Sequence, residues 1–462
     1  MSVVNRPGPG HPFAVPGLPH QRILSGLPAV PVTAVLALAA AVAVSATRWP
    51  LLVIPGAVGV AMIVGALVRL DFALLFFAAA VPLEYSVALG GNPQLTLVKL
   101  AGALCFASFA IQLATRRKRL RLDVTHAMLL GILGLILIAA VAAHALDTAA
   151  LATVRYASYV GLYFVLTSFA GDHRTLERFV WVLSVASAIA GALAVRNLLI
   201  GLDTRATPTY GDANDLAYIL STTVPLTLWL LHRRGVHRLA VLALVAVIGI
   251  ADVLTLSRGA AVGLGCALVW ALLSHRHQFR AVVAPLMIVA AAIGAVALTQ
   301  PAQISVALRD KGIVAQSNVD HRFDAWRSAL LLIEAHPLVG VGPGNFQLYT
   351  AAVDNRPPAP DDPTVVHNAY LEVAAEIGLP ALALLVAYVL TSLSRLRRAV
   401  RQHVGPPSFA VAATASMIVA VTAALTLSEQ YYAPLWVIGA IATCLWQEAK
   451  ARPMAAPAGA AP

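Results

Sequence analysis

The chain has 462 residues, of which 59% are hydrophobic and 11% are charged, and its mean hydropathy is +0.80. A soluble domain carries roughly a quarter charged residues, so the composition excludes a soluble globular protein and indicates an integral membrane protein. The net charge of +11 comes from 32 Lys and Arg against 21 Asp and Glu. Because most basic residues cluster in connections on one side of the predicted spans, they indicate orientation in the membrane and no nucleic-acid partner.

Apolar runs of about 18 residues, each long enough to cross roughly 30 Å of hydrocarbon as a helix, recur along the chain. They are continuously apolar, which excludes the alternating strands of a membrane barrel. We therefore predict an all-α polytopic membrane protein with about 12–14 transmembrane helices, the lower number applying if two hairpin members are re-entrant. The candidate spans are 28–46, 51–68, 72–90, 97–114, 127–145, 149–170, 178–200, 215–231, 239–256, 259–274, 281–299, 368–393, 408–428 and 430–447.

The predicted organisation is a membrane bundle with one long loop before its last spans. In chain order, the segments are a disordered tail at 1–27, a bundle of about 11 spans at 28–299, an outer loop at 300–366, a motif helix with the last spans at 367–447, and a second disordered tail at 448–462. Positively charged connections stay in the cytoplasm. This rule places both termini in the cytoplasm and the long loop on the outer face.

An isolated arginine stands between two very apolar spans, in the stretch "LSRGA". A bare arginine near the membrane costs several kcal/mol, so Arg258 needs an anion or a carboxylate beside it. One alternative is a protein partner such as Glu84 or Asp252, and another is that the side chain extends to the interface.

The long loop contains an amphipathic helix, "HRFDAWRSALLLIEAHP", which Pro337 ends. Its apolar residues Phe323, Trp326, Leu330 and Ile333 recur at spacings of three and four, so we expect the helix to lie on the membrane surface or to cap the bundle. The loop as a whole has no excess of basic residues. Anion recognition there must come from single arginines, and Arg322 at the start of the helix is the best candidate.

Alternating glycines follow this helix in "HPLVGVGPGNF", where Gly340, Gly342 and Gly344 precede Asn345. No strand precedes them and no P-loop lysine follows, so a nucleotide-binding loop is excluded. Two interpretations remain open. The turn either presents its amides to an anion, or it is a structural loop that needs positive φ angles and close packing.

The stretch "HNAYLEVAAEIGLPA" enters an apolar run through His367, Asn368, Glu372 and Glu376. Ionisable groups close to bilayer depth mark a functional site by default. Gly378 and the following proline interrupt the helix, so we expect a short outer segment at 368–377 before the true span. His367 then lies at the rim of an outward cavity; the alternative is a histidine that caps a helix at headgroup level.

These segments together resemble the O-antigen ligase and polymerase superfamily of bacterial envelope enzymes. His367, Asn368 and Gly378 match the spacing of the ligase signature, whereas Ala381 stands where Gly, Thr or Tyr is expected. The segments around Arg258, Arg322 and the glycines resemble family segments and come in the expected order.

The resemblance implies a glycosyltransferase that takes a glycan from an undecaprenyl-diphosphate carrier. It acts at the outer, periplasmic face of the bacterial cytoplasmic (inner) membrane, without metal or cofactor, and passes the glycan to an acceptor glycolipid such as the lipid A core. His367 would be the base, because histidine titrates near neutral pH, and Arg258 and Arg322 would bind the diphosphate. The substrate-orienting residues would be Asn368, Glu372, Gly342, Gly344 and Asn345.

Two other functions remain open. The first is a polymerase that joins lipid-linked repeats of an O-antigen or exopolysaccharide, which differs from a ligase in the acceptor alone. The second is a polysaccharide transporter or lipid flippase, which also has many spans and buried charges. A transporter typically shows internal repeats and broken helices at mid-bilayer, and the sequence has no convincing repeat.

Overall fold

The structure is a computed structural model that describes residues 50–84, 86, 88–89, 92–233, 237–274, 322–353, 365–406, 408–428, 430 and 432–451. The candidate spans 28–46 and 281–299, both predicted tails and residues 300–321 of the long loop lie outside these residues. The chain divides into two units, Met1–Val64 and Gly65–Pro462. Helix α2 (Pro50–Val68) crosses the boundary, and the second unit holds all the elements that follow.

The second unit is helical apart from one hairpin. Its longer helices are α3 (Leu70–Ala80), α4 (Leu97–Ala114), α5 (Val124–Val141), α6 (Leu146–Thr167), α7 (His173–Leu199), α8 (Ala213–Trp229), α9 (Arg238–Leu254), α10 (Arg258–Ser274), α15 (Leu379–Arg401), α16 (Phe409–Ala423) and α17 (Ala433–Ala451). The shorter elements are the 3-10 turns η1 (Val81–Leu83) and η2 (Leu230–His232), the strands β1 (Ala88–Leu89) and β2 (Asn92–Thr96), a helix at 322–335, α13 (Phe346–Val353) and α14 (Ala369–Ile377).

The helices confirm the predicted fold class. Among the described residues, five helices are long and apolar enough to cross a membrane, namely α4, α5, α6, α7 and α15, and α10 and α16 are shorter apolar helices. Most predicted spans fall on one helix each, and α4 coincides with the predicted span 97–114. The protein is therefore an all-α polytopic membrane protein.

One predicted span is wrong as a continuous helix. The expected span 72–90 is the 11-residue helix α3, followed by η1 and then the hairpin of β1 and β2. Pro82 stands at the first turn of η1, and a proline supplies no backbone N–H to continue the ladder of α3. The chain therefore turns at this point and leaves Glu84 buried beside the turn.

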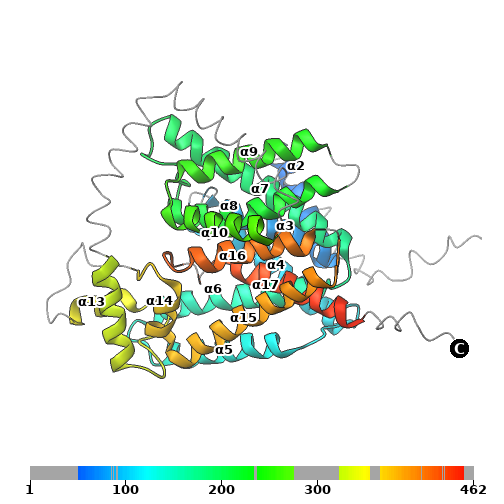
Figure 1. The fold of residues 1–462 in the computed structure, drawn as a ribbon. Helices are drawn as coiled ribbons and strands as arrows, with labels where there is room; N and C mark the ends of the chain where they lie inside the picture. Colours follow the sequence, from blue (N-terminus) through cyan, green and yellow to red (C-terminus); the bar gives the residue numbers. More distant parts are fainter. Residues whose placement is uncertain are drawn as a thin grey trace, which may run out of the picture. The chain divides into compact units, whose positions relative to one another are not determined.

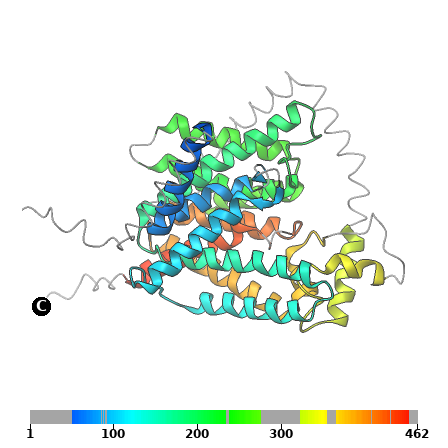
Figure 2. The same cartoon turned by 180° about the vertical axis from the view of Figure 1, so that it is seen from behind.

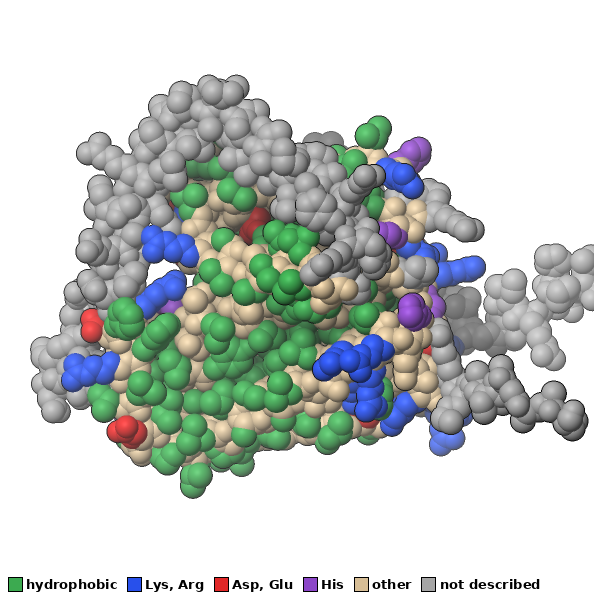
Figure 3. All heavy atoms as spheres, viewed as in Figure 1, with side chains coloured by type: hydrophobic (Ala, Val, Ile, Leu, Met, Phe, Trp, Pro, Cys, Tyr) green, Lys and Arg blue, Asp and Glu red, His purple; other side chains and the backbone are tan. Residues whose placement is uncertain are grey.

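The exterior of the bundle has the pattern of a surface that faces lipid. Figure 3 shows apolar side chains covering the face made by α5 and α15, with Lys and Arg toward its two ends. On this face Leu137, Val141 and Leu390 are 52%, 84% and 60% exposed. A soluble monomer rarely exposes so large an apolar surface, so hydrocarbon is the environment that this face fits.

Helices α13 and α14 lie at one end of the bundle that α5, α6 and α15 form, as both views show (Figures 1 and 2). The predicted break between the outer segment and the span is present. α14 ends at Ile377, Gly378 has φ 96°, and α15 begins at Leu379. A Cβ on Gly378 would collide with the Leu338 carbonyl. A glycine is therefore required at this position for two reasons, the positive φ and the close approach of the Leu338 carbonyl.

The helix at 322–335 packs on this end of the bundle, and half of the predicted stripe takes part. Ala325, Ala329 and Leu332 form its buried side, in a cluster with Val341 of the loop at 340–345, which we call the glycine loop. Trp326 and Ile333 of the predicted stripe are partly buried against this cluster. Phe323 and Leu330 are instead 60% and 52% exposed, so these two residues remain on the outside.

Candidate active site

His367 is fixed at the entrance to α14 by the connection between α16 and α17. Its backbone N–H donates to Ser428 Oγ over 3.0 Å, and the N–H of Ala369 is shared by the carbonyl oxygens of Ala424 and Leu427, each at 2.9 Å. His367 has φ 55°, a conformation that costs free energy for a residue with a side chain. Two long-range contacts therefore hold a strained residue in one place, which is typical of functional sites.

A buried carboxylate stabilises the turn at His367. Glu372, only 2% exposed, accepts the Val366 N–H at 3.2 Å and the Ser428 hydroxyl. Burial raises the pKa of Glu372 to about 6. Glu372 Oε2 therefore binds the backbone and the side chain that position His367, and the role of Glu372 in orienting substrate stays a prediction.

Asn368 also has a role in the local structure. Its Oδ1 accepts the backbone N–H groups of Tyr370 and Leu371, both at 3.1 Å, so the side chain is the N-cap of α14. The predicted start of the helix at this residue is confirmed. The cap uses the side-chain oxygen of Asn368, and a substrate contact through its amide group stays a prediction.

Arg322 lies close enough to His367, and Arg258 close enough to Arg322, for the charges of each pair to interact. Burial and, to a smaller extent, the charge of Arg322 together lower the pKa of His367 to about 4. Burial also lowers the pKa of Arg322, and the nearby charge of Arg258 adds to this effect. Arg322 begins the helix at 322–335 and Arg258 begins α10, so residues far apart in the sequence meet at one site.

Neither arginine has an ion-pair partner in the part of the chain that the structure describes. The alternative partners for Arg258, Glu84 and Asp252, form no ion pair with it there. Two like charges held close together repel each other. An anion bound between the two arginines would relieve this repulsion.

Sequence reasoning missed the acidic member of this site. The charge of Asp212 raises the pKa values of His367 and Arg322, which opposes the lowering caused by burial and by the neighbouring arginine. It caps α8 by accepting the Asn214 N–H at 2.6 Å, and its other oxygen lies 3.0 Å from the Arg205 guanidinium. The sequence gives no local signal of this role, because the approach of Asp212 to His367 depends on the fold.

Contacts within the protein hold the glycine loop. Glu376 accepts the N–H groups of Gly344 at 2.9 Å and of Phe346 at 3.2 Å, and the Glu376 carbonyl accepts the Gly342 N–H at 2.8 Å. The protein's own carboxylate therefore occupies the amides that an anion would need. The positive φ angles and the close contacts of these glycines favour the structural loop of the two interpretations, and a role of Gly342 and Gly344 in orienting substrate stays a prediction.

Asn345 belongs to the same scaffold. It is fully buried, its Oδ1 accepts the Ala145 N–H at 2.9 Å, and its amide donates to the Ala145 carbonyl at 3.3 Å and the Pro343 carbonyl at 3.2 Å. These bonds attach the glycine loop to the connection between α5 and α6. Asn345 thus contributes both its oxygen and its amide group to the packing of this loop, and a substrate contact by Asn345 stays a prediction.

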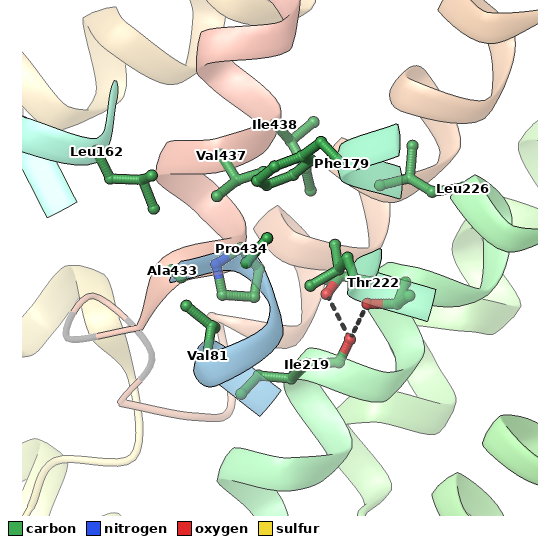
Figure 4. Close-up of a pocket in the computed structure, with 13 residues that line it drawn as sticks. Val81, Leu162, Phe179, Ile219, Thr222, Leu226, Ala433, Pro434, Val437 and Ile438 are labelled. Carbon is green, nitrogen blue, oxygen red and sulfur yellow. Dashed lines mark hydrogen bonds between the residues drawn. The ribbon is translucent and has the colours of Figure 1, made fainter. Parts of the chain in front are cut away.

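A cavity of about 20 Å³ lies deeper in the bundle and is not part of this site. It is lined by apolar residues of η1, α6, α7, α8 and α17, among them Phe179 and Pro434 (Figure 4). Thr222, the labelled polar residue, uses its hydroxyl on backbone carbonyls of its own helix. The described residues also contain no group of three His, Cys, Asp or Glu that could hold a metal ion.

Comparison with known proteins supports the assignment of this end of the bundle. Residues 242–386 match the family model described as O-Antigen ligase. A comparison with curated proteins found no match. The matched segment includes Arg258, Arg322 and His367, which the fold brings together. Over the segment that holds this site, the chain is therefore similar to the O-antigen ligase family.

Proposed function

We propose that the protein transfers a glycan from an undecaprenyl-diphosphate carrier to the lipid A core, at the periplasmic face of the inner membrane. One observation carries the proposal: two arginines without ion-pair partners in the described structure meet beside a histidine at one end of a membrane bundle. The arginines would bind the diphosphate, and the apolar exterior of the bundle would accommodate the prenyl chain. Both termini would lie in the cytoplasm.

In the proposed reaction, His367 removes the proton of the acceptor hydroxyl while that oxygen attacks the anomeric carbon of the donor. The bond between this carbon and the diphosphate oxygen breaks, and the diphosphate leaves with the electron pair. Arg258 and Arg322 stabilise the charge that develops on the leaving group. A diphosphate has a low pKa of its own, so this step needs no general acid.

The charge of the donor would activate the base. In the free protein, burial and Arg322 hold the pKa of His367 at about 4, so the imidazole is neutral but weakly basic. A bound diphosphate offsets the charge of Arg322 and raises the pKa of His367 toward neutrality. A general base is most effective when its pKa lies near the working pH. His367 would thus become an effective base when the donor is in place.

The proposal can be tested in a deletion strain that expresses the wild type or His367→Ala, with surface glycan and carrier-linked glycan resolved separately on gels. We expect His367→Ala, at equal expression, to lose surface glycan while long carrier-linked chains accumulate. Surface glycan limited to single repeats would identify a polymerase. Wild-type glycan from His367→Ala would refute the assigned base and favour a transporter.

A further inference from the structure

A second polar cluster lies near the same end of the bundle and has no role in the mechanism above. It consists of Glu84 after η1, Arg155 on α6, Asp215 on α8 and Tyr432 before α17, and we call it the Asp215 cluster. The Tyr432 hydroxyl donates to Asp215 Oδ2. The Arg155 guanidinium lies 5.9 Å from the centre of the Tyr432 ring, and its charge acts on both carboxylates.

Part of the hydrogen-bonding capacity of this cluster is unused. Glu84 is 8% exposed, yet its carboxylate has no hydrogen-bond or ion-pair partner among the residues that the structure describes. In the same set of residues, Asp215 forms a hydrogen bond through Oδ2 alone. A buried carboxylate that lacks hydrogen-bond donors is costly. Donors supplied by a ligand would remove this cost.

Two connections place the Asp215 cluster beside the proposed reaction site. Asp212 precedes Asp215 by three residues, or about 4.5 Å along the helix axis, and its charge acts on Asp215 as well as on His367. The connection between α16 and α17 holds the His367 turn through Ser428 and holds Asp215 through Tyr432. A ligand in the cluster would therefore approach His367 from the α8 and α17 side.

The charges of the cluster indicate which ligand it fits. The negative charges of Glu84 and Asp215 are offset by Arg155 and by Lys99, whose charge also acts on Glu84. A second diphosphate would gain little from such a balanced set. Neutral sugar hydroxyls fit better, because carboxylate oxygens accept O–H groups and a tyrosine offers an apolar ring beside its polar tip.

We propose that the Asp215 cluster is the subsite for the acceptor sugar, and this proposal rests on the proposed function. The donor diphosphate would occupy the arginines on one side of His367. Sugar hydroxyls of the acceptor would donate to Glu84 and Asp215 on the other side. The two carboxylates would position the acceptor so that its reacting hydroxyl reaches His367, and they are therefore binding residues.

The test uses the full-length protein in proteoliposomes, with undecaprenyl-diphosphate-linked glycan as donor and lipid A core glycolipid as acceptor. Initial rates are measured against each substrate at a saturating level of the other. We expect Asp215→Asn and Glu84→Gln each to raise the KM for the acceptor about tenfold, the effect of a lost hydrogen bond to a charged group, and to leave the KM for the donor within about twofold. Asp203→Asn, an exposed carboxylate in the preceding loop, is the matched control.

Tyr432→Phe removes one hydroxyl and is the milder variant if a charge change prevents folding. Elution of a variant as a single species shows that it is folded. An unchanged acceptor KM in properly folded variants, or an equal rise in both KM values, would overturn the subsite. The two proposals fail in different ways. If His367→Ala is fully active, the proposed function fails. If His367→Ala is inactive and Asp215→Asn keeps the wild-type acceptor KM, the subsite alone fails.

Discussion

Arg258 and Arg322 have like charges close together and no ion-pair partner within the described structure, which makes them the residues most sensitive to a bound anion. We expect Arg258→Gln and Arg322→Gln each to weaken binding of undecaprenyl diphosphate by about 10- to 100-fold, the value of a charge-assisted hydrogen bond. Arg327→Gln, exposed on the same helix as Arg322, should bind as the wild type does. The measurement is a titration of each purified variant; equal affinity in all three variants would contradict the anion site.

The pKa of His367 predicts a specific pH dependence. The neutral imidazole is the active form, so the rate falls as the pH drops through the pKa of the group. In the free enzyme, the acid limb of kcat/KM should lie near pH 4. The acid limb of kcat should lie at higher pH, because the bound diphosphate raises the pKa of His367. Coincident acid limbs would show that the donor does not act on the base.

Sequence reasoning selected His367, Arg258 and Arg322 because ionisable groups are unusual in an apolar context, and their roles stay predictions. It did not separate the two roles of Asn368, because an asparagine before a helix fits both a cap and a substrate contact. It also missed Asp212, a polar residue in a polar loop with no local signal. Such roles depend on contacts between distant segments, which one sequence does not reveal.

At the scale of elements, the break between α14 and α15 positions the site and depends on Gly378. We expect Gly378→Ala to destabilise the protein, because its backbone conformation alone costs about 1–3 kcal/mol for a residue with a side chain and the new Cβ would also collide with the Leu338 carbonyl. Gly134→Ala on α5, where an added Cβ has no heavy atom within 4 Å, should cause no loss. Thermal unfolding in detergent compares the two, and equal midpoints would contradict the account.

The sequence predicted this break from a glycine and a proline in an apolar run, and it also located most membrane helices from their length. It did not predict that the glycine loop would pack on α14 through Glu376. The alternating glycines indicated unusual backbone angles but not the group that binds their amides. The span at 72–90 was mispredicted because hydropathy alone does not register the turn at Pro82.

At the scale of the whole molecule, a buried network holds the bundle together at the end opposite the site. Arg395, 4% exposed, lies 3.0 Å from Asp123 and donates to the hydroxyls of Thr125 and Thr443 at 2.9 and 2.7 Å. His126 contacts the other Asp123 oxygen at 3.0 Å. The network joins α5, α15 and α17, and these three segments are too far apart in the sequence for any pattern to have linked them.

Removing one member of this network should destabilise the bundle without changing the site. We expect Arg395→Met to cost about 3–5 kcal/mol, because it leaves the Asp123 carboxylate without its cation in a poorly solvated place. The double variant Asp123→Asn with Arg395→Met should recover part of this loss. Unfolding midpoints of the three proteins give the measurement; a single variant as stable as the wild type would contradict the structural role of the pair.

The central claim is that His367 is the base of a glycan transfer whose donor diphosphate lies on two arginines. The most direct test is the rate of glycan transfer in proteoliposomes by wild type and His367→Ala, with undecaprenyl diphosphate binding measured on the same samples. The account predicts a rate at least about 100-fold lower in the variant and unchanged or tighter binding. Transfer at the wild-type rate by a protein without His367 would contradict it.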